Sequence, residues 1–367
     1  MNGYNIFAGK KEIMGKKNFF DRFVVMLLLV VLCLAGCSPS AERENTTRTV
    51  TDSEGVEIEV AADITKAAPA IGAFAQMTEI VAGPGKIAAA ATKSISATFT
   101  NVFPDYLKSN PDGYDARSVE GLIASGAQVV YGPSSVLSDE QKDQLAAAGI
   151  PFVAINAIKS VAGMCASFMI IGDIFGEQGL ERAKNFVTYY RGNIQRAKEL
   201  TASVGDADKV SIICLRHSGG AYSTINGKDI CNEYFEAAGG INVAKNYTAR
   251  SAGTGLTVNQ EQIVTWNPAV IMAFTQSAQK AILADPALAQ VDAVKNRQVY
   301  VCPYGVYNWS VRSGEGAMLP LWLGTIMYPD RFADIDMAQV VKGFFNDYYA
   351  YAISDKEIAT VLAGSAN

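Results

Sequence analysis

The chain has 367 residues, of which 49% are hydrophobic and 18% are charged. This length suggests about two domains, and the apolar share excludes an intrinsically disordered protein. Asp and Glu outnumber Lys and Arg by 36 to 31, so the net charge of −5 argues against a nucleic-acid-binding protein. Because His217 is the single histidine, a His-based triad or a catalytic zinc site would have to be built around that residue alone.

The first 36 residues have the pattern of a removable export signal. Five Lys and Arg side chains precede an uncharged run over residues 23–35, which is shorter than the roughly 20 residues of a transmembrane helix. The end of the run, Leu34-Ala35-Gly36-Cys37, resembles a bacterial lipobox, in which cleavage precedes the cysteine and a diacylglyceryl group is attached to its sulfur. We therefore expect a signal peptide over 1–36, lipidation of Cys37 and a polar tether over 37–47. The alternative is a signal anchor that stays uncut, and Met14 is a second candidate start.

The mature chain is more acidic than the precursor and contains few cysteines. Without residues 1–36, 26 Lys and Arg stand against 34 Asp and Glu, a net charge of −8. The cysteines beyond Cys37 have no C-x-x-C spacing, so we expect buried free thiols, although export permits disulfides. They are Cys165, Cys214, Cys231 and Cys302. No nucleophile elbow, H-E-x-x-H or P-loop sequence is present, so we expect no enzymatic activity.

Strand-like and helix-like segments alternate along the mature chain, which favours an α/β fold with mainly parallel sheets. Residues 48–60 alternate around a turn at Asp52-Ser53-Glu54-Gly55, which indicates a hairpin. Further strands are expected over 87–91, 129–131, 152–155, 210–215, 270–274 and 298–302. Helices are expected over 118–124, 138–148, 161–175, 228–238, 314–327 and 338–350.

One long amphipathic helix is predicted over 179–204. Apolar residues recur there at steps of three and four, which places them on one face of a helix about 39 Å long. A helix of this length at mid-chain predicts a rigid strut between an N-terminal lobe over 48–178 and a C-terminal lobe over 205–367. The alternative is an ordinary core helix.

A repeat at an offset of 141 residues supports two lobes. Ser118 and Asn259 are each placed to cap a helix, and Glu120 and Glu261 follow two positions later. Each copy then has two apolar residues, a short loop and a buried strand. Short helix–strand units often match by chance. The glutamate at the same position in both copies strengthens the evidence for a repeat.

Taken in order, these motifs resemble the substrate-binding lipoproteins of ABC importers for iron chelates, haem and cobalamin. The resemblance covers nearly the whole mature chain and rests on the lipobox, the hairpin, the long helix, the repeat and a stretch near the end. That stretch is Trp309-Ser310-Val311-Arg312-Ser313-Gly314-Glu315-Gly316-Ala317 with Pro320-Leu321-Trp322. It implies an α/β fold of two lobes with mainly parallel sheets joined by one long rigid helix, with the ligand cleft between the lobes.

The same resemblance implies the partners and the location. The protein would capture an iron complex, a siderophore or haem, and deliver it to an ABC permease whose partner ATPase supplies the energy. It would be exported and lipid-anchored at the outer face of the cytoplasmic membrane, or periplasmic, without a cofactor or metal site of its own. In the family a glutamate on each lobe docks on permease arginines, and Glu120 and Glu261 match those positions. The alternative is that the helix dipole alone favours these carboxylates.

Other functions stay open at this point. The cargo could be cobalamin or another metal complex, and a cell-surface interaction lipoprotein without a transport role would share the same export signal. Large chelated ligands need aromatic walls and a few cations that meet carboxylates or catecholates.

Candidate ligand contacts follow the expected strands, because open α/β sheets bind ligands at the carboxyl ends of their strands. Arg216 and Tyr222 stand in a glycine-containing loop after a strand, although this could be a surface loop. His217 is a candidate axial haem ligand, or else a structural or exposed histidine. Arg312 either meets the ligand or braces its own loop. The full set is Phe99, Tyr131, Arg216, His217, Tyr222, Tyr304, Trp309 and Arg312.

Overall fold

The computed structural model describes residues 47–90, 96–109, 118–156, 158–249, 251–252 and 255–365. The expected signal peptide, the lipidation site Cys37 and the tether up to residue 46 lie outside the described residues. Within the described ranges, no helix combines the length and the apolar character needed to cross a membrane.

The N-terminal part is built on a hairpin and a small parallel sheet. Strands β1 (Thr47–Thr51) and β2 (Glu57–Ala61) pair antiparallel, as the alternation predicted. The sheet has the order β3-β4-β5 and consists of β3 (Ala67–Pro69), β4 (Val129–Gly132) and β5 (Phe152–Ala154). The prediction of a strand over 87–91 was wrong. Within the described residues, this segment forms only one bridge, between Ala67 and Ile87. Gly83 and Gly85 have positive φ on either side of Pro84, so the chain turns there and leaves little room to extend.

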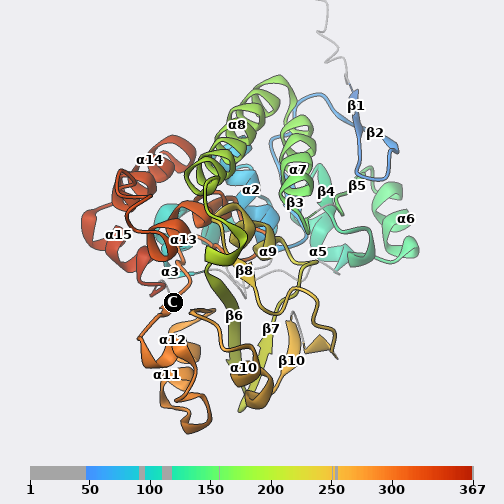
Figure 1. Cartoon of the computed structure of the whole chain (residues 1–367). Helices are drawn as coiled ribbons and strands as arrows, with labels where there is room; N and C mark the ends of the chain where they lie inside the picture. Colours follow the sequence, from blue (N-terminus) through green and yellow to red (C-terminus); the bar gives the residue numbers. More distant parts are fainter. Residues whose placement is uncertain are drawn as a thin grey trace, which may run out of the picture. The chain divides into compact units, whose positions relative to one another are not determined.

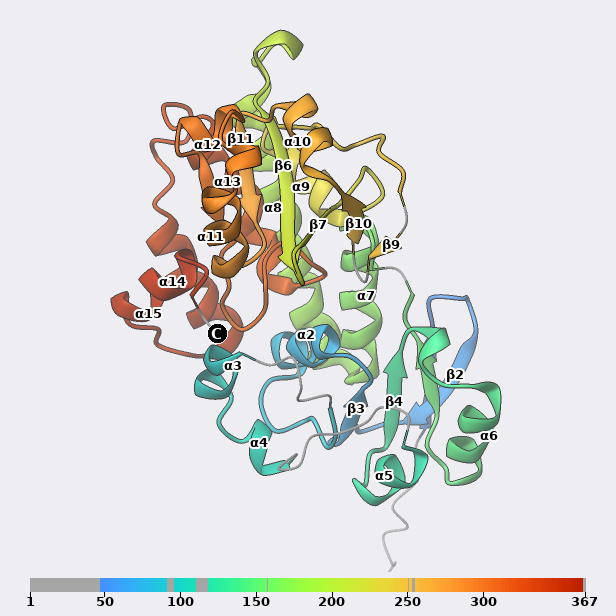
Figure 2. The same cartoon turned by 90° about the horizontal axis from the view of Figure 1, so that it is seen from below.

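Helices surround this sheet (Figure 2). The predicted helices appear as α5 (Val119–Ala124), α6 (Asp139–Ala147) and α7 (Val161–Ile174). Three more are α2 (Gly72–Ala82), α3 (Ala97–Val102) and α4 (Tyr106–Ser109). Almost every residue of α2 is buried, including Gln76 and Glu79, so this helix lies in the centre of the core and not on its surface.

The long helix is α8 (Gly176–Thr201), with 26 residues, beginning and ending three residues before the predicted range. Figure 1 shows it beside α7. The predicted apolar stripe is buried at Ala183, Tyr190 and Ala197 among others. The two helices touch closely where Gly172 meets Gly179: a Cβ on Gly179 would lie 2.5 Å from the Gly172 carbonyl oxygen. Glycine at both positions therefore permits this helix–helix contact.

The second sheet has the order β12-β11-β6-β7-β10-β9, with β8 also paired to β6. Its strands are β6 (Ser211–Ser218), β7 (Ala221–Thr224), β8 (Ile241–Asn242), β9 (Ser251–Ala252), β10 (Gly255–Val258), β11 (Val270–Ala273) and β12 (Val299–Val301). Only β12, β11, β6 and β8 run parallel. Gly219 and Gly220, both with positive φ, turn β6 back on itself as β7, so the sheet is mixed. Arg216 and Tyr222 accordingly lie on paired strands, and the loop predicted for them was wrong.

The helices of the second part are α9 (Ile230–Ala237), α10 (Gln260–Trp266), α11 (Gln276–Ala284), α12 (Asp292–Lys295), α13 (Leu319–Met327), α14 (Met337–Tyr349) and α15 (Asp355–Leu362). The helix expected over 314–327 begins as a 3₁₀ segment, η4 (Gly314–Met318), before α13. Pro320 stands in the first turn of α13, where the missing N–H is tolerated.

The repeat has the same local structure in both copies. The Ser118 side chain accepts from the Gly121 N–H at 3.1 Å, and the Asn259 side chain accepts from the Gln262 N–H at 2.9 Å. The strands that follow, β4 and β11, begin 141 residues apart as well.

The two sheets and the long helix confirm the predicted fold class. Separate apolar clusters line each sheet, and a larger one includes α2, α7, α8 and α14. Because α14 packs on α2, the last part of the chain contacts the first. The residue bounds of the lobes, 48–178 and 205–367, stay a prediction.

Candidate functional site

A cavity of about 720 Å³ opens between the two parts of the chain. Ile158 and Lys159, which follow β5, lie on one side of it, and Arg216 on β6 and Phe274 after β11 lie on the other. This is the edge of the sheets at which the predicted ligand cleft was placed.

Cationic side chains dominate the wall of this cavity. Four of the described lining residues are basic, namely Lys159, Arg216, Lys228 and Arg312, and one is acidic, Asp229. The Arg216 guanidinium lies 4.1 Å from the centre of the Phe274 ring, a cation–π contact that holds the charge at the wall.

The carboxylate of Asp229 is already hydrogen-bonded at the start of α9. It caps this helix by accepting from the Cys231 N–H at 2.9 Å. Burial raises its pKa, and the charges of Arg216 and Arg312 oppose that rise. With four basic side chains and one carboxylate among the described lining residues, the wall has a surplus of positive charge.

The aromatic part of the wall, Tyr304 and Tyr307, stands on a loop that is fixed from both parts of the chain. The Ser96 hydroxyl, at the start of α3, donates to the Gly305 carbonyl at 2.9 Å. From the other side, Glu315 is fully buried and accepts from the Val306 N–H at 2.8 Å. The chain passes so close that a Cβ on Gly305 would lie 2.4 Å from Glu315 Oε2.

Glu315 is the centre of a buried polar network. It also accepts from Trp309 Nε1 at 2.8 Å and from the Tyr349 hydroxyl at 2.9 Å. The Gln76 amide donates to the same hydroxyl at 2.7 Å, and its oxygen accepts from the Gly314 N–H at 2.9 Å. Burial raises the pKa of Glu315 to about 7, with these hydrogen bonds opposing the rise. Neither Glu315 nor Gln76 was predicted as important, although a Gln inside an apolar helix signals a buried partner.

Of the predicted ligand contacts, the structure brings Arg216, Tyr304 and Arg312 to this cavity. Phe99 lies in the core. The centre of its ring is 4.6 Å from the centre of the Tyr106 ring and 5.1 Å from the centre of the Phe103 ring. Tyr131 is fully buried, and its hydroxyl is hydrogen-bonded to Thr78. Trp309 is also fully buried, and its Nε1 donates a hydrogen bond to Glu315.

His217 and Tyr222 do not line the cavity either. Successive residues of a strand point to opposite faces, so His217 faces away from the side that Arg216 occupies. Its ring lies 4.8 Å from the Tyr222 ring, and the Tyr222 hydroxyl donates to Asp285 Oδ2 at 3.0 Å. The two residues are paired across the β6–β7 hairpin, on a face where Tyr222 is buried in the apolar cluster of the second sheet.

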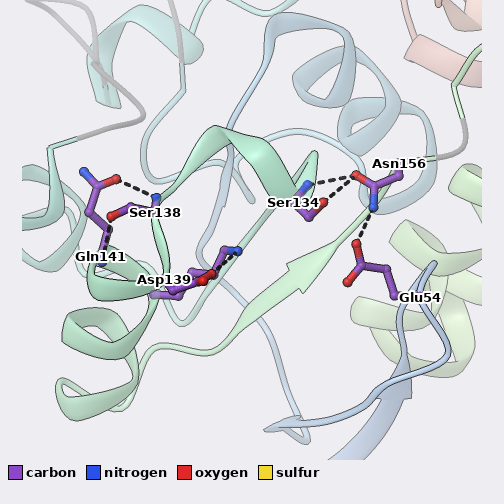
Figure 3. Close-up of polar contacts among 7 residues, drawn as sticks. Glu54, Ser134, Ser138, Asp139, Gln141 and Asn156 are labelled. Carbon is purple, nitrogen blue, oxygen red and sulfur yellow. Dashed lines mark hydrogen bonds and ion pairs between the residues drawn. The ribbon is translucent and has the colours of Figure 1, made fainter.

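The carboxyl ends of β4 and β5 hold the N-terminal hairpin (Figure 3). Asn156 Oδ1 accepts from the Ser134 N–H at 2.8 Å, and Asn156 Nδ2 donates to Glu54 Oε1 at 2.7 Å. A capping box between Ser138 and Gln141 then starts α6. These polar side chains serve the sheet edge and are not among the cavity-lining residues.

The two glutamates of the repeat are exposed on separate parts of the chain. Glu120 stands in the first turn of α5 and Glu261 in the first turn of α10. One turn further on, Ile123 and Val264 also occupy equivalent positions and are 43% and 39% exposed. Each copy therefore presents a carboxylate next to a bare aliphatic side chain.

The four remaining cysteines, Cys165, Cys214, Cys231 and Cys302, are buried free thiols, as expected. No three His, Cys, Asp or Glu side chains of the described residues are grouped so that they could hold a metal ion.

Comparison with known proteins agrees with this architecture. A sequence profile of the periplasmic binding protein family matches residues 104–304. The ABC transporter substrate-binding lipoprotein YvrC of Bacillus subtilis is 27% identical over 322 residues, covering 84% of this chain and 97% of YvrC. The molybdate-binding protein MolA of Haemophilus influenzae is 24% identical over 260 residues, covering 65% of this chain and 72% of MolA.

Solved structures share the fold. A periplasmic solute binding protein from Veillonella parvula superposes with a TM-score of 0.73 at 22% identity, covering 86% of this chain and 97% of that one. The relatives bind solutes and are not enzymes, in agreement with the missing catalytic motifs. The chain therefore belongs to the periplasmic binding protein family and is the substrate-binding protein of an ABC transporter.

Proposed function

We propose that this protein captures an anionic metal chelate outside the cytoplasm, with a ferric siderophore as the first candidate, and delivers it to an ABC permease. The observation that carries the proposal is the charge of the cavity wall, where four basic side chains face one carboxylate that already caps a helix. An anionic ligand is the natural complement of such a wall.

The size and the rings of the cavity support a chelate over a bare ion. A volume of about 720 Å³ falls in the range of roughly 300–1,000 Å³ that is typical of pockets for drug-sized ligands. The planar guanidinium groups of Arg216 and Arg312 suit the paired oxygens of carboxylates or catecholates. Phe274, Tyr304 and Tyr307 add flat apolar surface for the organic part of the ligand.

The metal would arrive already wrapped in its chelator. The described residues contain no group of three metal-ligating side chains, and bare divalent ions generally need several such ligands. Haem bound through an axial histidine is less consistent with the geometry, because His217 lies on the face opposite Arg216. This favours a siderophore over haem within the class.

Molybdate is the second candidate, because MolA is named for binding it and the cationic wall suits any oxyanion. A small tetrahedral ion would touch only part of a wall of this extent. Binding of molybdate without any chelate would replace the first candidate by this one.

Docking on the permease would use Glu120 and Glu261, with Ile123 and Val264 beside them. Two carboxylates on separate rigid units define an orientation, and charges at the rim of an interface steer encounter more than they add affinity. The exposed aliphatic neighbours would supply apolar area that becomes buried on contact. A lipid anchor on Cys37 would keep the protein near its permease, and YvrC is named as a lipoprotein.

The ligand is tested by thermal shift on the chain from residue 38 onward. The panel contains a ferric catecholate siderophore, haemin, cobalamin, molybdate and Ni²⁺. Ligand at about 100 times its Kd adds ~2.7 kcal/mol to the free energy of unfolding. We expect Arg312→Ala to weaken binding at least about tenfold, since it removes a charge-assisted hydrogen bond. Arg196→Ala, an exposed arginine on α8, is the matched control. Neutral sugars and peptides are tested alongside this panel. A thermal shift with one of them, and no shift with any anionic ligand, would contradict the proposal.

Docking is tested separately by charge reversal. Glu120→Arg and Glu261→Arg should leave ligand affinity unchanged and impair ligand uptake in cells. Glu140→Arg is the control, because Glu140 is likewise an exposed glutamate in the first turn of a short helix. Normal uptake by the double variant would show that these glutamates do not dock.

A further inference from the structure

A second, smaller cavity of about 230 Å³ lies at the carboxyl ends of α2 and α14. Pro84, Gly85, Ile87 and residues 102–106 complete its wall, and no described residue lines both this cavity and the cationic one. Its volume far exceeds the roughly 10–15 Å³ that a single water needs, so it has room for a ligand of several heavy atoms.

A buried carboxylate with one unpartnered oxygen atom faces this cavity. Glu79, on α2, is 3% exposed, and its Oε2 atom has no hydrogen-bond partner among the described residues. Arg182 is the nearby cation, but it donates to the Ile80 carbonyl at 2.9 and 3.2 Å and forms no ion pair with Glu79 within 4.0 Å. An unsatisfied buried acceptor costs about 1–3 kcal/mol, so this position needs an explanation.

The rest of the wall is aromatic and apolar. The rings of Phe103, Tyr106 and Tyr349 line the cavity, and those of Phe103 and Tyr349 meet edge to face at 5.2 Å. Asp105 adds a second carboxylate, exposed at the rim, where it forms an ion pair with Lys108. No Lys, Arg or His occurs among the described residues that line this cavity.

We propose that this cavity is a binding site for a small organic cation, an alkylammonium group, with Glu79 as its counter-ion and the three rings as its cage. Aromatic faces attract cations, and cages of this composition bind quaternary ammonium groups. A divalent metal fits less well, because Ca²⁺ takes six to eight oxygen ligands and the cavity offers one buried carboxylate among rings. Nothing in this assignment depends on the cargo of the cationic cavity.

Protonation of Glu79 should make the affinity of the site for a cation depend on pH. Burial raises the pKa of Glu79 to about 8, with Arg182 opposing the rise. The other titratable groups around it are Asp105 at the rim, which is paired with Lys108, and the phenols of Tyr106, Tyr131 and Tyr349, whose pKa values are raised by burial. A bound cation stabilises the ionised carboxylate, so affinity for the cation should increase as the pH rises toward 9.

The test titrates choline chloride into the chain from residue 38 onward, without any chelate. The readouts are calorimetry and thermal shift, with NaCl and CaCl₂ at equal ionic strength as controls. We expect saturable binding of choline that strengthens at least about tenfold between pH 6 and pH 9, following the ionisation of one carboxyl. Glu79→Gln, which keeps the shape and removes the charge, should abolish it. Asp105→Asn, an exposed change that leaves the fold intact, should weaken it about two- to fivefold.

Three results would overturn the assignment. They are no saturable signal with choline, a signal with CaCl₂ alone, and a signal that is unchanged in Glu79→Gln. Arg312→Ala separates this site from the cationic cavity, because that variant should lose anion binding and keep choline binding.

Discussion

Two buried glutamates in this protein have opposite surroundings. Glu315 supports the loop of the cationic cavity and accepts hydrogen bonds from Val306, Trp309 and Tyr349. Glu79 lines the acidic cavity, and its Oε2 atom accepts none from the described residues. Both side chains are at most 3% exposed, so burial alone does not distinguish them.

The difference shows in their proton affinities. Burial raises the pKa of both carboxyls, to about 7 for Glu315 and to about 8 for Glu79. Hydrogen bonds favour the charged form of Glu315, whereas Glu79 has only the more distant charge of Arg182. A buried carboxylate that accepts several hydrogen bonds braces the segments around it, whereas the unpartnered Oε2 atom of Glu79 is an acceptor for the proposed cation.

The largest effect is expected from removing the brace. Glu315→Leu leaves the Val306 N–H, the Trp309 N–H and the Tyr349 hydroxyl without an acceptor inside the core. At about 1–3 kcal/mol for each unsatisfied group, the free energy of unfolding should fall by at least ~3 kcal/mol in urea denaturation. Glu140→Leu on the exposed face of α6 is the control and should change it by less than about 0.5 kcal/mol. A loss below about 1 kcal/mol for Glu315→Leu would contradict its role as a brace.

The pH dependence of stability should separate the two glutamates further. In the unfolded chain each carboxyl ionises near 4.5, while the folded chain keeps its proton up to about 7 for Glu315 and about 8 for Glu79. Between those values the unfolded chain binds fewer protons, so the free energy of unfolding falls as pH rises, by at most about 1.4 kcal/mol per pH unit for each group.

Glu79→Gln should remove the part of the fall in the free energy of unfolding that Glu79 causes up to about pH 8. The variant should therefore be more stable than the wild type at pH 9. Glu315→Gln should remove the loss only up to about pH 7. It should also destabilise the fold, since an amide nitrogen cannot accept from the surrounding donors. Urea denaturation from pH 5 to pH 9 measures both, and parallel curves for wild type and Glu79→Gln would contradict the raised pKa.

The smallest effect is expected at the residue that both regions share. The Tyr349 hydroxyl donates to Glu315, and the Tyr349 ring lines the acidic cavity. Tyr349→Phe should cost about 1–2 kcal/mol and raise the pKa of Glu315 further, because it removes one hydrogen bond and the acceptor of Gln76. Choline affinity should stay within about twofold, since the ring remains. A large loss of choline binding would mean that the hydroxyl, and not the ring, meets the cation.

Local features were predictable where neighbouring residues decide them. The stripe of α8 follows the helical period, and the caps at Ser118 and Asn259 follow from residue types that bond their own helix. The hairpin of β1 and β2 follows from its alternation and its turn. The β6–β7 hairpin was missed, because Gly219-Gly220 suits a loop as well as a tight turn. That ambiguity placed Arg216 and Tyr222 in a shared loop.

The candidate site was predicted in part for the same reason. Arg216, Tyr304 and Arg312 were found because each stands near the end of a strand or before a helix, where side chains reach a sheet edge. Phe99, Tyr131 and Trp309 carry the same residue types in similar places, yet they are buried. Whether an aromatic side chain faces a cavity or the core depends on the elements packed over it, and the local sequence does not contain them.

The sequence by itself determined the fold class, the long helix, the repeat and the binding-protein family, because periodicity, caps and motif order are properties of short segments and their succession. Only the tertiary structure decided which charges meet. It brings a residue of β6 and residues from after β5, β11 and β12 around one cationic cavity. It also brings Tyr349 from the end of α14 to Glu315 beside the loop donors Val306 and Trp309, and it leaves Glu79 Oε2 facing a cavity without a donor. Partners such as Gln76 and Tyr349 are distant in the chain, and only packing of the core brings them together.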